Sequence, residues 1–412
     1  DGLGRPSYEK LRAHLKAAAN DIDSPLHLVA RVIGLEKQPS AGNVRHEQRS
    51  LLDKLRKRQQ AAQSRERSLQ VVRSTKVGER NYQPVTRAWT ESDIVEIYDD
   101  QLHPDHWITA GHRFGKRPAR IGEFWLETHK EGTPRLRVVA SNCAASNRLS
   151  PKLTGMLRTR TFEVTGDHLW FRYRGNADLF VAIDSFRMTL GAAPHKVVLQ
   201  KIEPSPHRWT WHSIPLRDYV GHRIHLEFTP NDDFALNRIL FAAEEPPASQ
   251  RIARWQQDQL TATIGDDAPL ADLAGAVVQP LISCVDRFAS GAMDADDARL
   301  MNWLIEHEDL LEPIPEWSQQ LAGELAAYEH QRGQLEHQLP EPVRALSLLD
   351  GTGEDEPVHL RGNHRNLSDH AVGRRIMEAL GGTTALEGHR TKHLRQDAPR
   401  PRRGSGRMEL AR

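Results

Sequence analysis

Two tryptophans separated by one residue, Trp209 and Trp211, are the side chains in this sequence that most directly suggest contact with a ligand. If their segment is a β-strand, both rings point to the same face of the sheet, because side chains alternate along a strand. Rings that share a face could form a platform on which a sugar stacks. They could equally fill the core of a β-sandwich, and we favour the core because aromatic side chains carry much of its burial.

Carboxylates and histidines are the other groups that could do chemistry. A glycosidase needs two carboxyl groups about 5–10 Å apart across a sugar-binding cleft. The available carboxylates are Asp99, Asp100, Asp105, Asp184, Asp232 and Asp233. The last two belong to a turn pattern, where Asp is ordinary. Three histidines, His103, His106 and His112, lie close together, but their spacing matches no metal-ligand pattern. We therefore predict no catalytic residue and no metal site.

A second candidate for ligand binding is the tripeptide Arg361-Gly362-Asn363. Gly362 permits a close backbone approach, and the Arg361 guanidinium can hold a carboxylate through two hydrogen bonds. Structural anchoring by Arg361 is the alternative, and we favour it. Nearby, Gly351 and Gly353 are not followed by the Lys and Ser or Thr of a phosphate-binding loop, so no nucleotide site is predicted.

Length and charge exclude several broad functions. The chain has 412 residues, enough for two or three domains. Its 56 Lys and Arg almost balance its 55 Asp and Glu, so no global field favours nucleic acid or a membrane surface. The basic stretch from Arg45 to Lys76 has few aromatic residues, which is typical of a solvated helix face, and no nucleic-acid partner is predicted. No apolar run reaches about 18 residues, so no membrane span is predicted.

The cysteines and the chain ends limit the setting further. Only Cys143 and Cys284 are present, which excludes a disulfide framework and a haem-attachment motif and leaves a single bridge open. The sequence starts at Asp1 without Met or a signal-peptide pattern, and it stops soon after Ser405, which could cap a further helix. We expect the chain to be an interior fragment of a longer protein.

The periodicity of apolar residues divides the chain into four segments. Residues 1–83 are predicted to be helical and to include a long helix with a heptad stripe. Residues 84–245 contain many short β-branched and aromatic runs separated by turn residues, which predicts a β-sandwich or jelly roll. Residues 246–345 are predicted to be helical, with a second long helix that ends before Pro340. Residues 346–412 form the truncated start of a further domain, partly disordered, with a short helix near Val372–Leu380.

The two long helices each have a narrow apolar seam that needs a partner, so we expect them to pack as an antiparallel, coiled-coil-like pair. The predicted fold class is therefore mixed, with separate all-α and all-β parts. A central antiparallel β-sandwich is flanked by helical segments.

Three stretches of the central segment resemble jelly-roll modules that accompany glycosidases in exported proteins. Leu149 to Phe162 resembles their L-x-G-x-L-x-S-x-x-F opening, and Trp211 to Phe228 looks like their W-D-x-S-x-x-x-G-H-R-A-x-I-E stretch. Val181 to Phe186 looks like their V-x-L-x-I-D-G strand, with Asp184 at its acidic position. The resemblance implies a lectin-like, galactose-binding-like jelly roll with carbohydrate as its ligand, and Asp184 among the binding residues.

The end of the chain resembles a second family. Asp350 to Asn366, followed by Arg374 and Arg375, is similar to the D-x-P-V-x-I-R-G-N … R-R start of a planctomycete domain of unknown function, family fifteen fifty-three. The helical start resembles the tail of its usual upstream companion, family fifteen forty-nine. These are large exported proteins that usually carry a c-type cytochrome domain. The resemblance implies export to the periplasm or cell envelope, haem c elsewhere in the full-length protein, and the neighbouring domains as partners.

Taken together, the sequence predicts a non-catalytic binding or structural region of a large exported protein, with no cofactor of its own. The predicted ligand is carbohydrate, with Trp209, Trp211, Asp184, Arg361 and Asn363 as candidate contacts. One alternative is a purely structural sandwich that positions redox domains. The other is part of an enzyme whose site lies outside this fragment.

Overall fold

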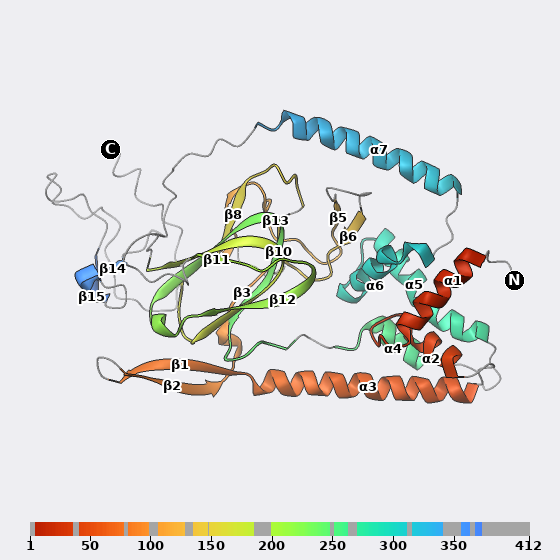
Figure 1. Cartoon of the computed structure of the whole chain (residues 1–412), viewed down its shortest axis with the longest axis horizontal. Helices are drawn as coiled ribbons and strands as arrows, with labels where there is room; N and C mark the ends of the chain where they lie inside the picture. Colours follow the sequence, from red (N-terminus) through yellow and green to blue (C-terminus); the bar gives the residue numbers. More distant parts are fainter. Residues whose placement is uncertain are drawn as a thin grey trace. The chain divides into compact units, whose positions relative to one another are not determined.

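The computed structural model describes residues 5–35, 41–77, 81–98, 106–127, 135–146, 148–184, 199–247, 251–262, 270–310, 315–340, 356–362 and 367–372. The chain forms two compact units, coloured by sequence in Figure 1. The helical unit comprises Asp1–Ser68, Ala119–Cys143 and Pro246–Pro340, and the sheet unit comprises Leu69–Pro118, Ala144–Glu245 and Glu341–Arg412. The fold is mixed, as predicted. Each unit is assembled from separate stretches of sequence, however, and does not follow the four consecutive segments expected.

Three helices begin the helical unit: α1 (Arg5–Ala18), α2 (His27–Leu35) and α3 (Ala41–Ser68). Apolar residues spaced by helical turns bury one face of α2 against α3, with a contribution from the neighbourhood of α4 (Arg254–Thr261). The buried residues are Leu28, Val32, Val44, Leu51 and Leu55. From Arg56 to Ser68 no side chain of α3 is buried, which agrees with the solvated basic face predicted for it.

The rest of the helical unit packs around a second core. It consists of α5 (Leu270–Ala289), α6 (Ala295–Glu306) and the hairpin of β5 (Phe124–Glu127) and β6 (Arg135–Val138). Its buried residues include Val138, Trp255, Cys284, Leu300 and Met301. Asn302 on α6 ties the hairpin to this core, because its side-chain amide bonds both the N–H and the carbonyl of Val138, at 2.9 and 2.7 Å.

The two cysteines lie in the helical unit, and no disulfide joins them. Cys143 and Cys284 are both buried. Burial raises the pKa of the Cys284 thiol to about 11, so this thiol stays protonated near neutral pH.

The last helix of the helical unit, α7 (Pro315–Gln338), buries no side chain. Trp317, Leu321 and Leu335 are 69%, 59% and 65% exposed, so the apolar stripe that predicted a partner helix faces solvent. The structure therefore does not show the expected coiled-coil-like pair of α3 and α7. Within the described ranges, every helix is too short or too polar to cross a membrane.

A nine-stranded antiparallel sheet dominates the other unit. Its strands are β3 (Ile94–Ile97), β4 (Ile108–Gly111), β7 (Ala144–Ala145), β8 (Gly155–Arg158), β9 (Phe162–Glu163), β10 (His168–Ile183), β11 (Leu199–Lys201), β12 (Ser205–Pro215) and β13 (Arg223–Phe241). The path β11-β10-β13-β8-β4 forms its spine, β12 pairs with β10, and β3, β7 and β9 pair with β13. The antiparallel β-strands predicted for this region are confirmed.

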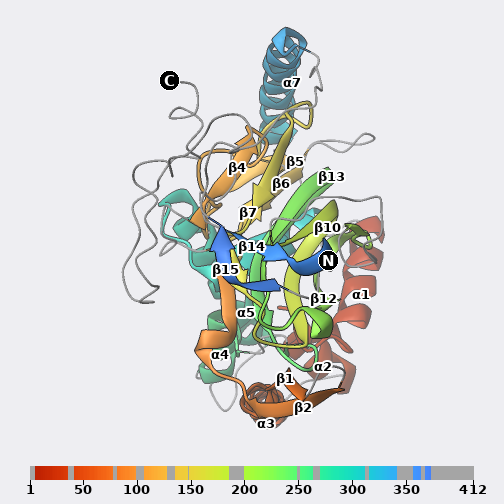
Figure 2. The ribbon, with the colours of Figure 1, turned by 90° about the vertical axis from the view of Figure 1, so that its left-hand side faces the viewer.

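The two longest strands, β10 and β13, run side by side through the whole sheet (Figure 2). The register between them shifts near Gly175, where φ is +91°, so both strands bend there. The bend folds the sheet around one core. The Phe171 ring from one half lies 5.3 Å from the Phe228 ring of the other half. Because β10 and β13 belong to both halves, the hydrogen bonding is continuous, whereas a sandwich of two separate sheets was expected.

Two hairpins complete the sheet unit. The hairpin of β1 (Gln70–Val77) and β2 (Asn81–Ala88) begins directly after α3, so most of it lies within residues 1–83, which were predicted to be helical. The hairpin of β14 (Glu356–His359) and β15 (Leu367–Val372) lies near the end of the chain. The short helix predicted near Val372–Leu380 falls outside the described residues, apart from Val372 itself, which ends β15.

Among the residues that the structure describes, short 3₁₀ helices occupy the connections Glu91–Asp93, Arg217–Tyr219, Glu308–Leu310 and Leu360–Gly362.

Candidate functional site

The two candidate tryptophans lie on β12 and face away from the sheet core. His212 directly follows Trp211 on β12, and the centroid of its ring lies 5.0 Å from that of the core residue Phe171. Since neighbouring side chains on a strand point to opposite faces, Trp211 points outward. Trp209 and Trp211 are half-buried, and the core positions on β12 belong to His212 and Ile214. Neither tryptophan belongs to the main core of the sheet unit, where we expected both; Trp211 packs instead on the smaller buried cluster of Leu69, Leu240 and Ala242.

His212 takes part in the core as a neutral ring. Burial lowers its pKa from the ordinary value, and the nearby charge of Glu203 only partly opposes this effect. Its Nε2 lies 3.1 Å from Oε1 of Gln200. These contacts turn the imidazole inward and leave the opposite face of the strand to the tryptophans.

Four half-buried tryptophans gather on the outer face of this half of the sheet, and we call this surface the tryptophan face. Its members are Trp170, Trp209 and Trp211, together with the arginines Arg172 and Arg238 and with Trp89, which also packs against the main core of the sheet unit. Three of the rings, those of Trp89, Trp170 and Trp211, pack on the buried side chains of Leu69, Leu240 and Ala242. A hydrogen bond of 3.0 Å from Nε1 to the Ala242 carbonyl fixes Trp170 as well.

The register of the strands places the arginines among these rings. In one row across the sheet, Trp211, Arg172, Arg238 and Ile97 lie on neighbouring strands; in the next row, the order is Ser213, Trp170, Leu240 and Ile94. The Arg172 guanidinium lies over the Trp209 ring, with its central carbon 5.6 Å from the ring centroid. The site thus combines flat aromatic surfaces with positive hydrogen-bond donors.

Sequence reasoning missed the arginines of this face, although a signal was present. In the strand that runs from Leu169 to Tyr173, apolar Leu169, Phe171 and Tyr173 alternate with Trp170 and Arg172. This pattern assigns Trp170 and Arg172 to one face, opposite the core. The pairing of β10 with β12 and β13, which brings Trp211 and Arg238 beside Arg172, cannot be read from the alternation.

Asp184, the third candidate, lies beyond the far end of β10 from Arg172 and is buried. Its Oδ2 is 2.5 Å from Nδ1 of His222, and its Oδ1 accepts a hydrogen bond of 3.0 Å from the backbone N–H of Arg223. The residue has φ of +46°, in the left-handed region. The structure thus places Asp184 at the junction of β10 and β13 and does not bring it to the tryptophan face.

A second polar group on the outer face of the sheet was also missed by sequence reasoning. Arg158, His225 and Glu227 are buried. His225 and Glu227 alternate along β13 with the core residues Leu226 and Phe228, and Arg158 is the cross-strand partner of Glu227. Nε2 of His225 is 2.9 Å from Oε1 of Glu227, and its Nδ1 is 3.4 Å from the Arg158 guanidinium. Because arginine only donates, Nδ1 accepts and Nε2 donates to the carboxylate. His225 therefore links the guanidinium of Arg158 to the carboxylate of Glu227, while the Nε of Arg158 is buried without a hydrogen-bond partner.

The remaining candidates lie in the β14–β15 hairpin. Arg361 is exposed in the turn between the strands, with φ of +54°. The left-handed backbone conformation in this turn is thus adopted by Arg361, whereas the sequence analysis expected the special backbone feature, a close approach, at Gly362. Asn363 falls outside the described residues, so its role as a ligand contact stays a prediction.

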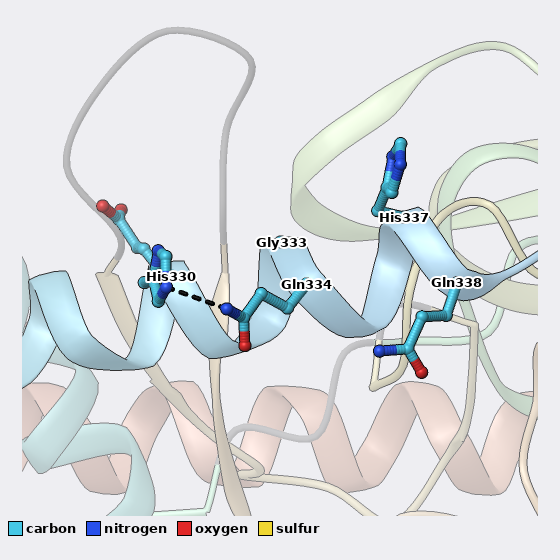
Figure 3. A pocket seen from close by; sticks show the side chains of 6 residues that line it. His330, Gly333, Gln334, His337 and Gln338 are labelled. Carbon is cyan, nitrogen blue, oxygen red and sulfur yellow. Dashed lines mark hydrogen bonds between the residues drawn. The ribbon is translucent and has the colours of Figure 1, made fainter.

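Metal-ligand groups and surface hollows contribute no further candidate residues among those that the structure describes. Among the described residues, no group of three or more His, Cys, Asp and Glu side chains could hold a metal ion. His106 lies 3.0 Å from a carboxylate oxygen of Glu96, and His103 falls outside the described residues. A hollow on α7 is lined by Glu329, His330, Gly333, Gln334, His337 and Gln338 (Figure 3). All six belong to one helix, so the hollow is a strip of helix surface.

No family model matches the chain, and no curated protein matches it. Among solved structures, it is similar to the K2 cleaved adhesin domain of Lys-gingipain, with 15% identity over 35% of this chain and 96% of that one and a TM-score of 0.23. It is also similar to a glycoside hydrolase family 43 arabinoxylan arabinofuranohydrolase from Bacillus subtilis, with 11% identity over 33% of this chain and 27% of that one and a TM-score of 0.17. At such TM-scores neither likeness bears on function.

Proposed function

We propose that this chain is a non-catalytic binding region whose sheet unit binds carbohydrate on the tryptophan face. One observation carries the proposal: Trp209 and Trp211 lie half-buried on the outer side of β12 while His212 and Ile214 take the core positions. An aromatic side chain outside the core leaves apolar surface in water. Rigid aromatic rings with a polar edge are the side chains that binding sites use for such contacts.

The geometry of the face suits a sugar ring. The C–H face of a pyranose packs against a flat indole, while its hydroxyl groups need donors and acceptors at the edge. Trp170 is held by its hydrogen bond to Ala242, and Leu69 and Leu240 support the rings from below, so the platform is formed before a ligand arrives. A preformed site loses less conformational entropy on binding.

The alternative of a purely structural unit is less well supported. A unit that only positions its neighbours needs no tryptophans on the outer face of its sheet, whereas Trp209 and Trp211 both lie half-buried on the outer face of β12. The setting in a large exported, cytochrome-linked protein of the planctomycete type also stays a proposal. It rests on the sequence resemblance, and it places haem c in another part of that protein because the two cysteines here are far apart in sequence.

The direct test is a binding screen of the whole 412-residue chain against an array of neutral and acidic glycans. We expect retention on at least one glycan, and loss of about tenfold or more in affinity for Trp209→Ala and Trp211→Ala, because each removes a stacking surface worth about 1 kcal/mol or more. The matched control is Trp317→Ala, which removes a 69% exposed tryptophan from α7. Failure of every glycan to bind, or equal binding by all variants, would overturn the proposal.

A further inference from the structure

We propose that the glycan bound by the tryptophan face is acidic, carrying carboxylate or sulfate groups that are held by Arg172 and Arg238. This inference rests on the proposed carbohydrate function and names its ligand class. Its first support is a like-charge pair. Arg172 on β10 and Arg238 on β13 are direct cross-strand partners on the outer face. Like charges directly opposite each other repel, and an anion bound between the two guanidinium groups would reduce that repulsion.

The second support is the surroundings of Arg238. Its Nε is buried without a hydrogen-bond partner, and no described residue forms a hydrogen bond or an ion pair with its guanidinium. Other arginines in the protein show what is usual. Arg217 donates to the Asp167 carboxylate at 3.0 Å. Arg113, whose Nε is also buried without a partner, still donates through a terminal nitrogen to the Asp232 carbonyl at 2.8 Å, whereas Arg238 has no such bond to a described residue. A half-buried guanidinium normally has such acceptors, because losing water without a partner is costly.

The third support is the composition of the two rows that cross the face. Besides the arginines they contain two tryptophans, two isoleucines, one leucine and one serine, and no acidic side chain. Within these two rows, a carboxylate or sulfate would therefore meet two guanidinium groups and no acidic side chain. The planar guanidinium can bond two oxygens of such a group at once, which fixes the orientation of the sugar that carries it. The Trp209 ring beside Arg172 would then receive the adjacent C–H face.

Single-stranded nucleic acid is the other ligand that combines anionic groups with stacking. It needs a positive groove that follows many successive phosphates. The two rows hold two arginines, and the chain as a whole has a net charge of +1. A short anionic sugar therefore fits the face better than a polyphosphate backbone, and an oligonucleotide belongs among the test ligands.

The experiment compares charged and uncharged forms of the same polymer on the whole chain. The probes are polygalacturonate against its fully methyl-esterified form, chondroitin sulfate against desulfated, carboxyl-reduced chondroitin, and oligothymidylate. We expect binding to at least one acidic polymer, at least about tenfold weaker binding to its neutralised form, and weakening of the acidic complex by raised salt. Arg238→Gln should reduce affinity for the acidic form by about tenfold and leave the residual affinity for the neutral form unchanged.

Arg73→Gln is the matched control, because it removes one positive charge from an exposed position on β1, away from the face. Equal affinity for charged and neutralised polymers would overturn the acidic ligand while supporting carbohydrate binding. Binding to oligothymidylate at the affinity of the acidic polymer would also overturn it. If no glycan of either kind binds, the proposed function fails as well. Should Arg238→Gln not fold, the preference of the unaltered chain for charged over neutralised polymer still decides the question.

Discussion

Asp297 shows how a single buried carboxylate organises the second core of the helical unit. It is the third residue of α6, and its oxygens accept hydrogen bonds from the Arg287 Nε at 2.7 Å, from Arg254 at 2.5 Å and from the backbone of Asp294 at 3.2 Å. Burial by itself would raise the pKa of Asp297, but the bonds from Arg287 and Arg254 outweigh it and lower the pKa to about 2. The carboxylate is therefore held charged.

Replacing this group should weaken the helical unit in a pH-dependent way. The folded pKa of about 2 lies below the ordinary 3.8, so the ion pairs contribute stability above pH 4 and lose it as the pH falls towards 2. We expect Asp297→Asn to lower the free energy of unfolding by about 2 kcal/mol at pH 7, with the difference from the unaltered chain shrinking between about pH 4 and pH 2. Chemical denaturation at several pH values measures this.

The control for Asp297 is Asp286→Asn, an exposed carboxylate on α5, which should change stability by less than about 0.5 kcal/mol. A loss that is the same at pH 2.5 and pH 7 would show that the effect is not one of charge.

The tryptophans mark the limit of sequence reasoning for single residues. Alternation correctly places Trp209 and Trp211 on one face of a strand, but it does not say which face is the core. The structure shows that His212 takes the core side of the strand. Its ring packs against the rings of Phe171 and Tyr173, with centroid distances of 5.0 and 6.4 Å. A hydrophobicity argument ranks tryptophan above histidine for burial and so selects the wrong face.

At the scale of elements, the bend in β10 and β13 depends on one glycine. Gly175 has φ of +91°, and a methyl carbon added to it would lie 1.7 Å from the carbonyl oxygen of Asp233 on the neighbouring strand. Only a residue without a side chain permits this approach. The bend in turn brings Phe171 and Phe228 together, so the close approach of two backbones is what lets the sheet enclose its core.

Gly175→Ala should therefore be much more damaging than a substitution that only adds backbone strain. Gly221 is the matched position, because its φ is +87° but an added methyl carbon would have no heavy atom within 4 Å. We expect Gly221→Ala to lower the free energy of unfolding by about 1 kcal/mol and Gly175→Ala by at least about 3 kcal/mol. Equal losses in thermal and denaturant unfolding would contradict the close approach at Gly175.

Helix α7 illustrates why a periodic pattern does not identify a partner. Leu321, Tyr328 and Leu335 repeat at heptad spacing, and the helix itself forms as predicted, but all three side chains are exposed. Heptad spacing predicts that residues share one face of a helix and contains no information on what covers it. On α3, Leu55 of the predicted stripe is buried with Leu28 and Val32 of α2, and the other buried leucine, Leu51, lies outside that stripe.

At the scale of the whole molecule, the order of segments in the sequence does not match the composition of the two units. Residues 119–143 lie between parts of the sheet unit but belong to the helical unit, because Val138 is buried with Trp255, Cys284 and Met301. The β5–β6 hairpin has the same alternating pattern as the strands of the large sheet. The local pattern predicts that a segment is a strand, whereas tertiary packing decides to which unit the strand belongs. For this reason the sequence predicts a single β segment from residue 84 to residue 245 that includes the β5–β6 hairpin.

The start of the sheet unit gives a test at this scale. The predicted boundary at residue 84 excludes β1, yet Val71 on β1 is 1% exposed in the core of the sheet unit. Asp167, a buried carboxylate of the same unit, donates its backbone N–H to the Val72 carbonyl at 2.5 Å and accepts a bond of 3.0 Å from the Ser74 hydroxyl. The hairpin is thus part of this core, and Leu69 just before it supports the tryptophan face.

We therefore expect Val71→Ala to lower the free energy of unfolding by about 2 kcal/mol, since it removes buried methyl groups and leaves a cavity. Val85 on β2 is the matched control, because it belongs to the same hairpin and is 52% exposed, so Val85→Ala should cost less than about 0.5 kcal/mol. Denaturant unfolding of the whole chain measures both. If Val71→Ala and Val85→Ala lower the free energy of unfolding by the same small amount, the hairpin is not part of the core. The sheet unit then begins near residue 84, as the sequence alone predicted.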